Sequence, residues 1–297
     1  MNAPFDDASS AADLTPTGEL PQRRPRRKGK AADSIWTRLR AGAAQEICIE
    51  PMLAQLYAPI LRSESLEEAL ASKLAVKLGH GAFPAEPLRT LLLDAALADA
   101  RFGAAARADL AAVVERDPAS GRLLEPFLFF KGFAAIQTHR LAHWFWRAGR
   151  RNLALYLQSR ASEAFQSDIH PGARLGKGLF LDHATGFVAG ETVVIEDNVS
   201  ILHGVTLGGT GTRKTDRHPK IRTGVLIGAG AHIIGDIEIG AYSKIAAGSF
   251  VTQSVPARCT AVGVPARIVE GAGSTNPAKS MDQKLSEGTY ESFTYVI

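Results

Sequence analysis

Apolar side chains recur at every sixth position through much of the second half of the chain. One series runs from Ile169 to Val205, and a second runs from Ile221 to Val251. A six-residue period fits a short strand with an inward-pointing residue, followed by a tight corner. Three such strands close a triangular coil, and successive coils stack as parallel strands about 4.8 Å apart. The pattern predicts a parallel β-helix with inward residues Ile169, Leu175, Leu181, Phe187, Val193, Val199, Val205, Ile221, Ile227, Ile233, Ile239, Ile245 and Val251.

The gap between the two series is longer than the period allows. Val205 and Ile221 are separated by four residues more than two hexads, so we expect a loop to leave the coil there. The loop contains Arg217 and His218, a cation and an imidazole.

Helical spacing of apolar residues characterises the chain before the repeats, from about Ala32 to Gln166. Aromatic residues cluster in its last part, most simply as core or interface packing. The expected helices begin after a cap at Asp33 or Ser34 and cover residues 50–61, 65–78, 86–101 and, as one long helix or two abutting ones, 127–165.

These patterns place the chain in the α+β class and divide it into four segments. Residues 1–32 are expected to form a disordered basic tail, and residues 33–166 an α-helical domain. Residues 167–270 form the predicted β-helix, and residues 271–297 a flexible C-terminal tail.

The net charge of +4 does not indicate a nucleic-acid-binding protein, because half of the excess lies in residues 1–32. No apolar run is long enough for an ordinary membrane helix, and the N-terminus lacks the basic and apolar regions of a signal peptide. Two cysteines, Cys48 and Cys259, are too few for a disulfide framework. We therefore expect a cytoplasmic protein that binds neither nucleic acid nor a membrane.

Asp168 and His183 are candidates for catalysis on their chemistry alone. They are fifteen residues apart, nearly one coil, so adjacent coils can bring them together near one edge. A carboxylate beside an imidazole fixes its tautomer and raises its basicity, as a general base for an alcohol requires. The alternative is a structural histidine that is hydrogen-bonded at a corner.

The loop and the glycines suggest binding sites. Arg217 and His218 can clamp the carboxylate of an amino acid, although an ordinary solvated loop is the alternative. Stretches rich in glycine and alanine at 208–211, 228–230 and 246–248 leave a smooth groove with accessible backbone amides. Such a groove suits the pantetheine arm of coenzyme A.

The chain resembles the serine O-acetyltransferases of bacterial cysteine synthesis over about residues 34–270. The resemblance rests on DIHPGARLGKGLFLDHATGFVAGETVVIEDNVSILHGVTLGGTG, DRHPKIRTGVLIGAGA and GVPARIV, and on EPMLAQLYAPIL, RDP and FLFFKGFAAIQTHRLAHWFWRAGRR in the helical half. It implies an N-terminal helical domain, a left-handed parallel β-helix, and homotrimers that pair as dimers of trimers. It also implies direct, metal-free acetyl transfer from acetyl-CoA to L-serine, with L-cysteine as a feedback inhibitor.

The resemblance also implies roles for individual residues. His183 would deprotonate the serine hydroxyl, with Asp168 as its orienting carboxylate. The implied ligands of serine are Asp117 and Asp182 for the ammonium group and Arg217 and His218 for the carboxylate. The implied acetyl-CoA groove involves Gly209, Thr210, Ala229, Lys244 and Ala247.

The last residues of the chain, FTYVI, form an apolar end that a solvated tail does not need. In the family that the chain resembles, a terminal isoleucine inserts into the active site of O-acetylserine sulfhydrylase, where its carboxylate mimics the amino-acid substrate. Ile297 is therefore the candidate partner-binding residue.

Three other functions remain open from the sequence. A related acetyltransferase can act on homoserine or a sugar hydroxyl, although Asp117 in the RDP break favours a small amino acid. Trimeric zinc carbonic anhydrases share the fold, but His183, His203 and His218 lack the close pair expected there. The third alternative is a non-enzymatic scaffold that only binds a partner, but such a scaffold does not require Asp168, His183 and His218.

Overall fold

The computed structural model describes residues 33–81, 83–211, 215–269, 271 and 274–285. The predicted tail of residues 1–32 and the predicted partner-binding residue Ile297 lie outside these ranges. From Ser34 onward, the described residues belong to one compact unit. None of the helices in these ranges is both long enough and apolar enough to cross a membrane.

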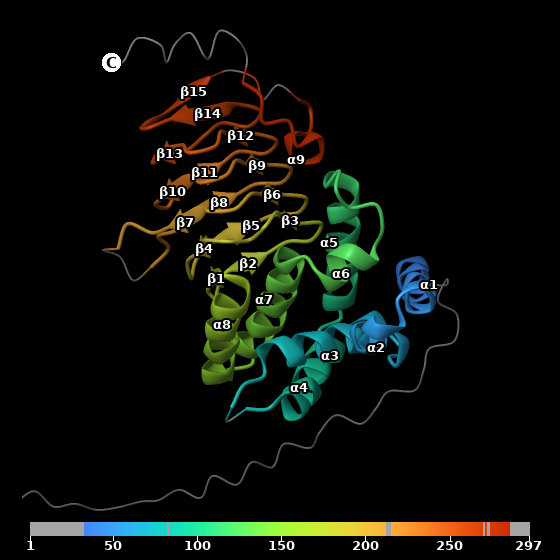
Figure 1. Cartoon of the computed structure of the whole chain (residues 1–297). Coiled ribbons are helices and arrows are strands. Elements are labelled where there is room, and N and C mark those ends of the chain that lie inside the picture. The colour runs from blue at the N-terminus through green and yellow to red at the C-terminus, as the bar shows by residue number, and fades with distance from the viewer. Residues whose placement is uncertain (1–32, 82, 212–214, 270, 272–273, 286–297) are drawn as a thin grey trace, which may run out of the picture. The chain divides into compact units, whose positions relative to one another are not determined.

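Helices fill the described chain up to residue 165 (Figure 1). Ser65 caps α3, because its side chain accepts a hydrogen bond from the Glu68 backbone amide, and the Glu68 carboxylate accepts one from the Glu64 amide. The elements are α1 (Ser34–Ile49), the 3₁₀ turn η1 (Pro51–Leu53), α2 (Ala54–Leu61), α3 (Leu66–Leu78), α4 (Ala85–Ala98), α5 (Phe102–Arg116), α6 (Leu124–Leu128), α7 (Lys131–Arg147) and α8 (Arg151–Phe165).

Two of the expected helices have different bounds in the structure. The helix expected over 86–101 stops at Ala98, because Asp99 adopts an extended conformation, and α5 follows as a separate helix. The segment 127–165 contains the end of α6 and two further helices, α7 and α8, which pack against each other. They are separated at Gly149, whose φ of 78° is a conformation that favours glycine.

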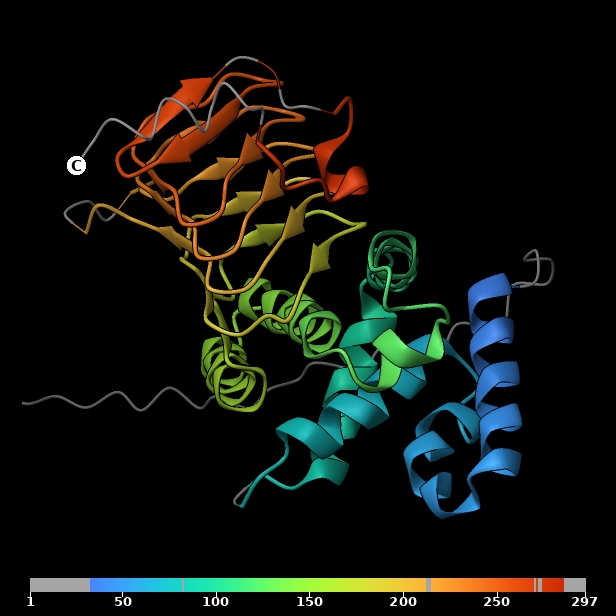
Figure 2. The same ribbon diagram turned by 45° about the horizontal axis from the view of Figure 1, so that its top comes forward.

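The strands form three sheets that are the flat faces of a triangular coil (Figure 2). The sheet orders are β1-β4-β7-β10-β13, β2-β5-β8-β11 and β3-β6-β9-β12-β14-β15, with parallel pairing up to β14 and an antiparallel β14–β15 pair. The strands are β1 (Ser167–Ile169), β2 (Arg174–Leu175), β3 (Phe180–Leu181), β4 (Phe187–Ala189), β5 (Val194–Ile195), β6 (Ser200–Ile201), β7 (Thr206–Gly208), β8 (Lys220–Ile221), β9 (Leu226–Ile227), β10 (His232–Ile234), β11 (Glu238–Ile239), β12 (Lys244–Ile245), β13 (Phe250–Val251), β14 (Thr260–Gly263) and β15 (Ala266–Val269).

The strand register contains an insertion that the sequence pattern concealed. Ile169 pairs with Ala189, so the first coil has twenty residues, two more than three hexads. Each hexad has two inward-facing positions, which are two residues apart. The two-residue insertion therefore moved the predicted apolar series from the first inward position to the second, and the series continued without a visible break. Phe187 and Val193 occupy the second inward position and are also buried. The two extra residues belong to the corner 182–186, between β3 and β4.

A second insertion separates β7 from β8, where the loop is expected. Ala189 and Ile195 are six residues apart, whereas their partners Leu207 and Ile221 are fourteen apart. Eight residues therefore leave the coil, and the prediction of four is wrong because the first insertion had shifted the register. We name the column of corners above 182–186 the His183 edge and the column that contains 209–219 the Arg217 edge. The sheet that begins with β1 lies between these two edges.

A buried ion pair joins the helices to the first coil. Asp109 of α5 is fully buried and accepts hydrogen bonds from Arg140 Nη2 at 2.7 Å and from the Leu179 backbone amide at 3.0 Å. The helix α7 also approaches closely, since a side chain at Gly132 would collide with the Leu181 carbonyl. The helical layer therefore holds the strand that leads into the His183 edge.

The described part of the C-terminal segment, residues 274–285, contacts both the coil and the helices. Its helix α9 (Pro277–Ser280) buries Ala278, whose carbonyl accepts a hydrogen bond of 2.7 Å from Ser200 Oγ. Lys279 lies 2.7 Å from the Glu115 carboxylate of α5. The sequence predicts a flexible tail here, and these contacts instead hold this part of it in place.

Candidate active site

His183 projects from the corner that carries the two extra residues. Its backbone is left-handed, with a φ of 55°, and 72% of its side chain is exposed. The helical layer holds this corner, because the Gly186 amide donates to the Gln166 carbonyl at 2.8 Å and the Lys131 ammonium donates to the Thr185 hydroxyl. The imidazole is therefore presented to solvent from a well-anchored backbone.

One carboxylate, that of Asp182, lies near His183, and the charge of a second, Asp117, acts on Asp182. Asp182 Oδ1 is 3.6 Å from His183 Nε2, and Asp117 follows directly after α5. Burial raises the pKa of Asp182, the charge of His183 lowers it, and the negative charge of Asp117 raises it again. The ring of His203, in the next coil, lies 5.8 Å from that of His183. The structure thus brings three predicted residues together and adds His203, which the sequence suggested only as a zinc ligand.

Asp168 does not contact His183 in this chain. Its Oδ1 accepts a hydrogen bond of 2.6 Å from Gln158 Nε2 of α8. Within the described ranges, no hydrogen bond or ion pair joins Asp168 to His183. The reason is their position, because Asp168 lies in the middle of β1 while His183 lies at the corner that precedes β4.

Asp168 lies instead near the residues of the Arg217 edge. Burial lowers the pKa of His170, at this edge, while the charges of Glu191 and Asp168 raise it and that of Arg217 lowers it. Arg217 Nη2 is 2.9 Å from Glu191 Oε2. The charges of Asp168, Glu191 and Arg217 therefore all act on one imidazole, that of His170.

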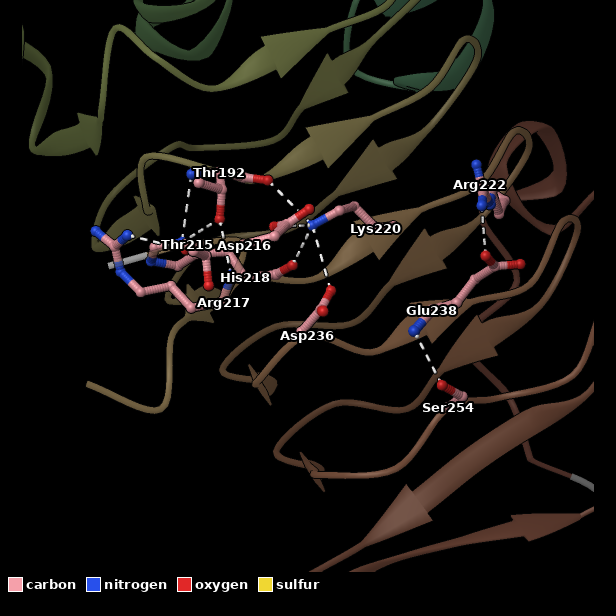
Figure 3. Close-up of polar contacts among 10 residues, drawn as sticks. All are labelled: Thr192, Thr215, Asp216, Arg217, His218, Lys220, Arg222, Asp236, Glu238 and Ser254. Carbon is pink, nitrogen blue, oxygen red and sulfur yellow. Dashed lines mark hydrogen bonds and ion pairs between the residues drawn. The ribbon is translucent and has the colours of Figure 1, made fainter. Parts of the chain in front are cut away.

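Thr192 and Lys220 hold the loop residues Arg217 and His218 (Figure 3). The Thr192 hydroxyl accepts a hydrogen bond of 3.2 Å from the Arg217 amide and lies 2.8 Å from His218 Nδ1. Lys220 Nζ donates to the Asp216 carboxylate and to the His218 carbonyl, both at 2.6 Å. His218 is buried, and this burial, followed by the charges of Arg217 and Lys220, lowers its pKa.

Two of the residues predicted for the coenzyme lie on the His183 edge. Ala229 and Ala247 occupy the second and third corners above His183. The backbones of this edge approach closely, since a Cβ on Gly204 would lie 3.4 Å from the Cα of Gly230. The glycines with positive φ along it are Gly186, Gly204, Gly230 and Gly248. Each corner of this edge therefore contains a glycine with positive φ, and alanines stand at the second and third corners above the imidazole.

The other three residues predicted for the coenzyme lie elsewhere. Gly209 and Thr210 are at the Arg217 edge, where a Cβ on Gly209 would be 3.0 Å from His218 Nε2. Lys244 of β12 is buried and donates a hydrogen bond of 2.7 Å to the Lys284 carbonyl, and burial lowers its pKa. The five residues do not line one groove within one chain.

The sequence did not point to Gln158, Thr192 and Lys220, which form hydrogen bonds with the predicted site residues. Thr192 and Lys220 stand in the segments GET and HPK, next to predicted residues. Polar residues are expected at the corners of any β-helix, so their local pattern carried no distinguishing signal. Their role follows only from the hydrogen bonds.

A cavity of about 790 Å³ lies away from these groups, between the α4–α5 junction, α7 and β2. None of the predicted site residues lines it. Among the residues that the structure describes, no three His, Cys, Asp or Glu side chains are arranged to hold a metal ion. His183 and His203 lie on one edge and His218 on another, so the three histidines of the zinc alternative do not meet in one chain.

Comparison with known proteins decides the family. The family description "Serine acetyltransferase, N-terminal" matches residues 35–138, and "Bacterial transferase hexapeptide (six repeats)" matches residues 218–253. The serine acetyltransferase of Salmonella typhimurium is 51% identical over 262 residues, which cover 88% of this chain and 96% of that protein. The chain belongs to the serine acetyltransferase family.

Solved structures of serine acetyltransferases share its fold. The Brucella abortus enzyme in complex with coenzyme A has 57% identity and a TM-score of 0.80, covering 82% of this chain and 98% of that one. A serine acetyltransferase in complex with cysteine has 48% identity and a TM-score of 0.83, covering 85% and 98%. Membership confirms the predicted fold class, a helical region followed by a β-helix, and the predicted acetyl-CoA-dependent serine O-acetyltransferase.

Proposed function

We propose that this member of the family transfers the acetyl group of acetyl-CoA to the hydroxyl of L-serine with His183 as the general base. The observation that supports this role best is the exposed imidazole on a left-handed corner, with Asp182 3.6 Å away. A general base needs a nitrogen that the hydroxyl can approach, and the imidazole of His183 is largely exposed.

The reaction balances with one base. His183 takes the proton of the serine hydroxyl as the oxygen attacks the carbonyl carbon of the thioester. The tetrahedral intermediate collapses when the carbon–sulfur bond breaks, and the imidazolium returns the proton to the departing thiolate. The products are O-acetyl-L-serine and free coenzyme A.

The ammonium and carboxylate groups of serine would bind to different sets of side chains, one at the His183 edge and one at the Arg217 edge. The ammonium group would lie between Asp117 and Asp182, where a cation relieves the repulsion between the two carboxylates. The carboxylate would bind Arg217, whose guanidinium can form two parallel hydrogen bonds with it, and His218.

A complete site needs two copies of the chain. The His183 and Arg217 edges are separated by three-residue strands, about 10 Å, whereas the ammonium and carboxylate of an amino acid share one carbon. If the His183 edge of one copy meets the Arg217 edge of the next, both groups face one substrate. Three such head-to-tail contacts close a ring, so we propose a homotrimer with three shared sites.

The sheet between the two edges supports this ring. Val188 of β4 and Phe250 of β13 lie on its outer face and are 38% and 39% exposed. Contact between copies around the threefold axis would remove these apolar side chains from water.

In this arrangement Asp168 would orient the partner subunit's His183. Gln158 occupies Oδ1 of the carboxylate, which leaves Oδ2 for an imidazole that approaches from the partner subunit. The pairing of carboxylate and base that the sequence predicts would then form between chains.

Acetyl-CoA would lie along the same contact between subunits. Ala229 and Ala247 would form one side of the groove, and Gly209 and Thr210 of the partner subunit the other. The Lys244 ammonium would reach the coenzyme only after it releases the Lys284 carbonyl. The coenzyme A complex of the Brucella abortus relative supports a coenzyme site on this fold.

L-Cysteine would compete with serine for this site, because it presents the same ammonium and carboxylate and differs by sulfur for oxygen. The cysteine complex of a serine acetyltransferase supports this inhibition. The variant Arg217→Ala should weaken serine and cysteine together, and unchanged cysteine inhibition in it would point to a separate site.

Two further interactions complete the proposal. Ile49, Met52 and Leu53 are 66%, 90% and 43% exposed at the end of α1 and in η1, and this apolar patch would join two trimers. Ile297 would bind the active site of O-acetylserine sulfhydrylase through its terminal carboxylate.

A cytoplasmic location agrees with the free thiols of Cys48 and Cys259.

The acceptor is tested by thiol release from acetyl-CoA with L-serine, L-homoserine and a galactoside. We expect the highest kcat/KM with serine, because the two proposed clamps fit an α-amino acid with a short side chain. A higher kcat/KM with homoserine or the galactoside would replace serine by that acceptor.

A further inference from the structure

The cavity of about 790 Å³ beside α7 has the size of a small-molecule site, for which about 300–1,000 Å³ is typical. One wall comes from the α4–α5 junction and from α7, and the other comes from β2 and the two corners that flank it. A ligand bound there would contact the helical layer and the coil at the same time. None of the residues proposed to bind serine or acetyl-CoA, or to act as the base, lines this cavity.

Two buried polar side chains belong to the lining of the cavity. His139 is 4% exposed, and the side chain of Arg140 is 10% exposed. Arg140 has five N–H groups, of which Nε and one on Nη2 donate to Asp109 Oδ2 at 3.0 and 2.7 Å. Nη2 also donates to the Gly176 carbonyl at 2.6 Å, and Nη1 makes one long contact of 3.4 Å with the Leu175 carbonyl. Within the described residues, one N–H of this buried guanidinium is therefore left without an acceptor.

Three further cations of the lining, Arg147, Arg174 and Lys177, are exposed to solvent. Their side chains form no hydrogen bond or ion pair with any residue that the structure describes. The other two cations that line the cavity are paired with carboxylates. The lining holds one more carboxylate, that of Asp197, which accepts a hydrogen bond of 2.8 Å from the Lys177 backbone amide. Positive charge is therefore in excess around the cavity.

The two imidazoles of the lining respond to this charge. Burial lowers the pKa of His139 to about 3, and the charges of His143 and Arg140 lower it to a smaller extent. Burial also lowers the pKa of His143, and the charges of Arg147 and Arg101 act in the same direction. Both rings are therefore neutral at neutral pH, and the positive field comes from guanidinium and ammonium groups. Walls of one sign of charge raise the local concentration of a ligand of the opposite sign.

Most of the remaining side chains of the lining are apolar, namely Phe102, Ala104, Ala105, Trp146 and Leu175. An inorganic anion would neutralise the cations but leave this apolar surface in contact with water, which is unfavourable. A carboxylate on an apolar body would cover the apolar surface as well, and a guanidinium can form two parallel hydrogen bonds with it. The chemistry of the lining therefore fits a small organic acid.

We propose that this cavity is a binding site for a small organic acid, whose carboxylate is held by Arg147, Arg174 and Lys177 and whose apolar body lies against Phe102 and Leu175. The site is separate from the one proposed for serine, and it does not depend on which acceptor receives the acetyl group. Because the ligand would contact α7 and β2 together, its binding would stabilise the junction between the helices and the coil.

Calorimetry of the full-length protein with 2-naphthoate, an aromatic carboxylate, and with 2-naphthamide, its uncharged analogue, tests the site. The double variant Arg174→Gln/Lys177→Gln removes two of the unpaired cations. The matched control is Arg267→Gln, because Arg267 is also an exposed cation of the coil, on β15, but does not line the cavity. The variant Arg217→Ala reports binding of the probe at the proposed serine site. Thiol release from acetyl-CoA with L-serine should be unchanged in both glutamine variants.

We expect saturable binding of 2-naphthoate at one site per chain. The Kd should be at least about tenfold higher for 2-naphthamide and for the double variant, because each loses hydrogen bonds between charged groups. Arg267→Gln and Arg217→Ala should bind the probe as the wild type does. The proposal is overturned by an absence of saturable binding, by equal affinity for the acid and the amide, or by an unchanged Kd in the double variant. A loss of affinity in Arg217→Ala would place the probe at the serine site and would also overturn it, while the proposed acetyl transfer would stand.

Discussion

A site shared between subunits can be tested by mixing two inactive variants. His183→Ala removes the proposed base from one edge, and Arg217→Ala removes the proposed carboxylate contact from the other. In a ring with head-to-tail contacts, every mixed trimer has one site that combines an intact His183 with the partner subunit's intact Arg217. With random assembly from equal amounts, about three quarters of the trimers are mixed and one site in three is intact, so about a quarter of the wild-type activity should return.

The assay measures thiol release from acetyl-CoA at serine concentrations well below the wild-type KM, after co-expression of the two variants with different affinity tags. The matched control mixes His183→Ala with Asp117→Ala. Both changes affect the same edge, so no combination restores a site. If the first mixture is no more active than its two components measured separately, the site lies within one chain and the reasoning from the two edges is refuted.

Four further outcomes are expected. His183→Ala should lower kcat by roughly 10²–10⁴ with the oligomer intact; a near-wild-type kcat would remove this residue from the mechanism. Gln158→Leu should lower kcat by about tenfold without raising KM for serine, because it loses a hydrogen bond that orients a carboxylate; equal kinetics would argue against that role. Asp109→Ala should lower the free energy of unfolding by about 3–5 kcal/mol in urea titrations, because it leaves the largely buried guanidinium of Arg140 without its carboxylate; a loss under about 1 kcal/mol contradicts this. Deleting Ile297 should abolish binding to O-acetylserine sulfhydrylase in calorimetry and leave acetyl transfer unchanged, whereas equal affinity would refute the contact.

The fold was predictable from the sequence because the repeat has a simple physical cause. An inward residue such as Ile195 must be apolar in every coil, so a six-residue period survives and can be read. The same cause concealed the insertion at His183, since Phe187 and Val193 fill a second inward position and continue the series. Spacing alone therefore identifies a β-helix but does not place its corners.

The sequence predicts residue types for the candidate site, whereas the arrangement of those residues depends on the fold. Asp168 and His183 are nearly one coil apart in sequence, which suggested a contact within one chain. A coil has three edges, however, and small changes in corner length decide which side of a sheet a residue faces. The hydrogen bonds from Gln158 and Thr192 depend on this arrangement and leave no mark in the local pattern.

The stacking of corners on the His183 edge has a consequence for how such enzymes can change. In a solenoid each repeat contacts only its neighbours, so a coil can be gained or lost at the far end without disturbing the first. The His183 insertion lies in the first coil, and three more corners rise above it, spanning about 14 Å. In the proposed site, the number of coils would set the length of the groove for the coenzyme, and the two added residues at the base form the corner that carries the proposed base. The length of the proposed coenzyme groove and the proposed reactive corner can therefore be altered independently.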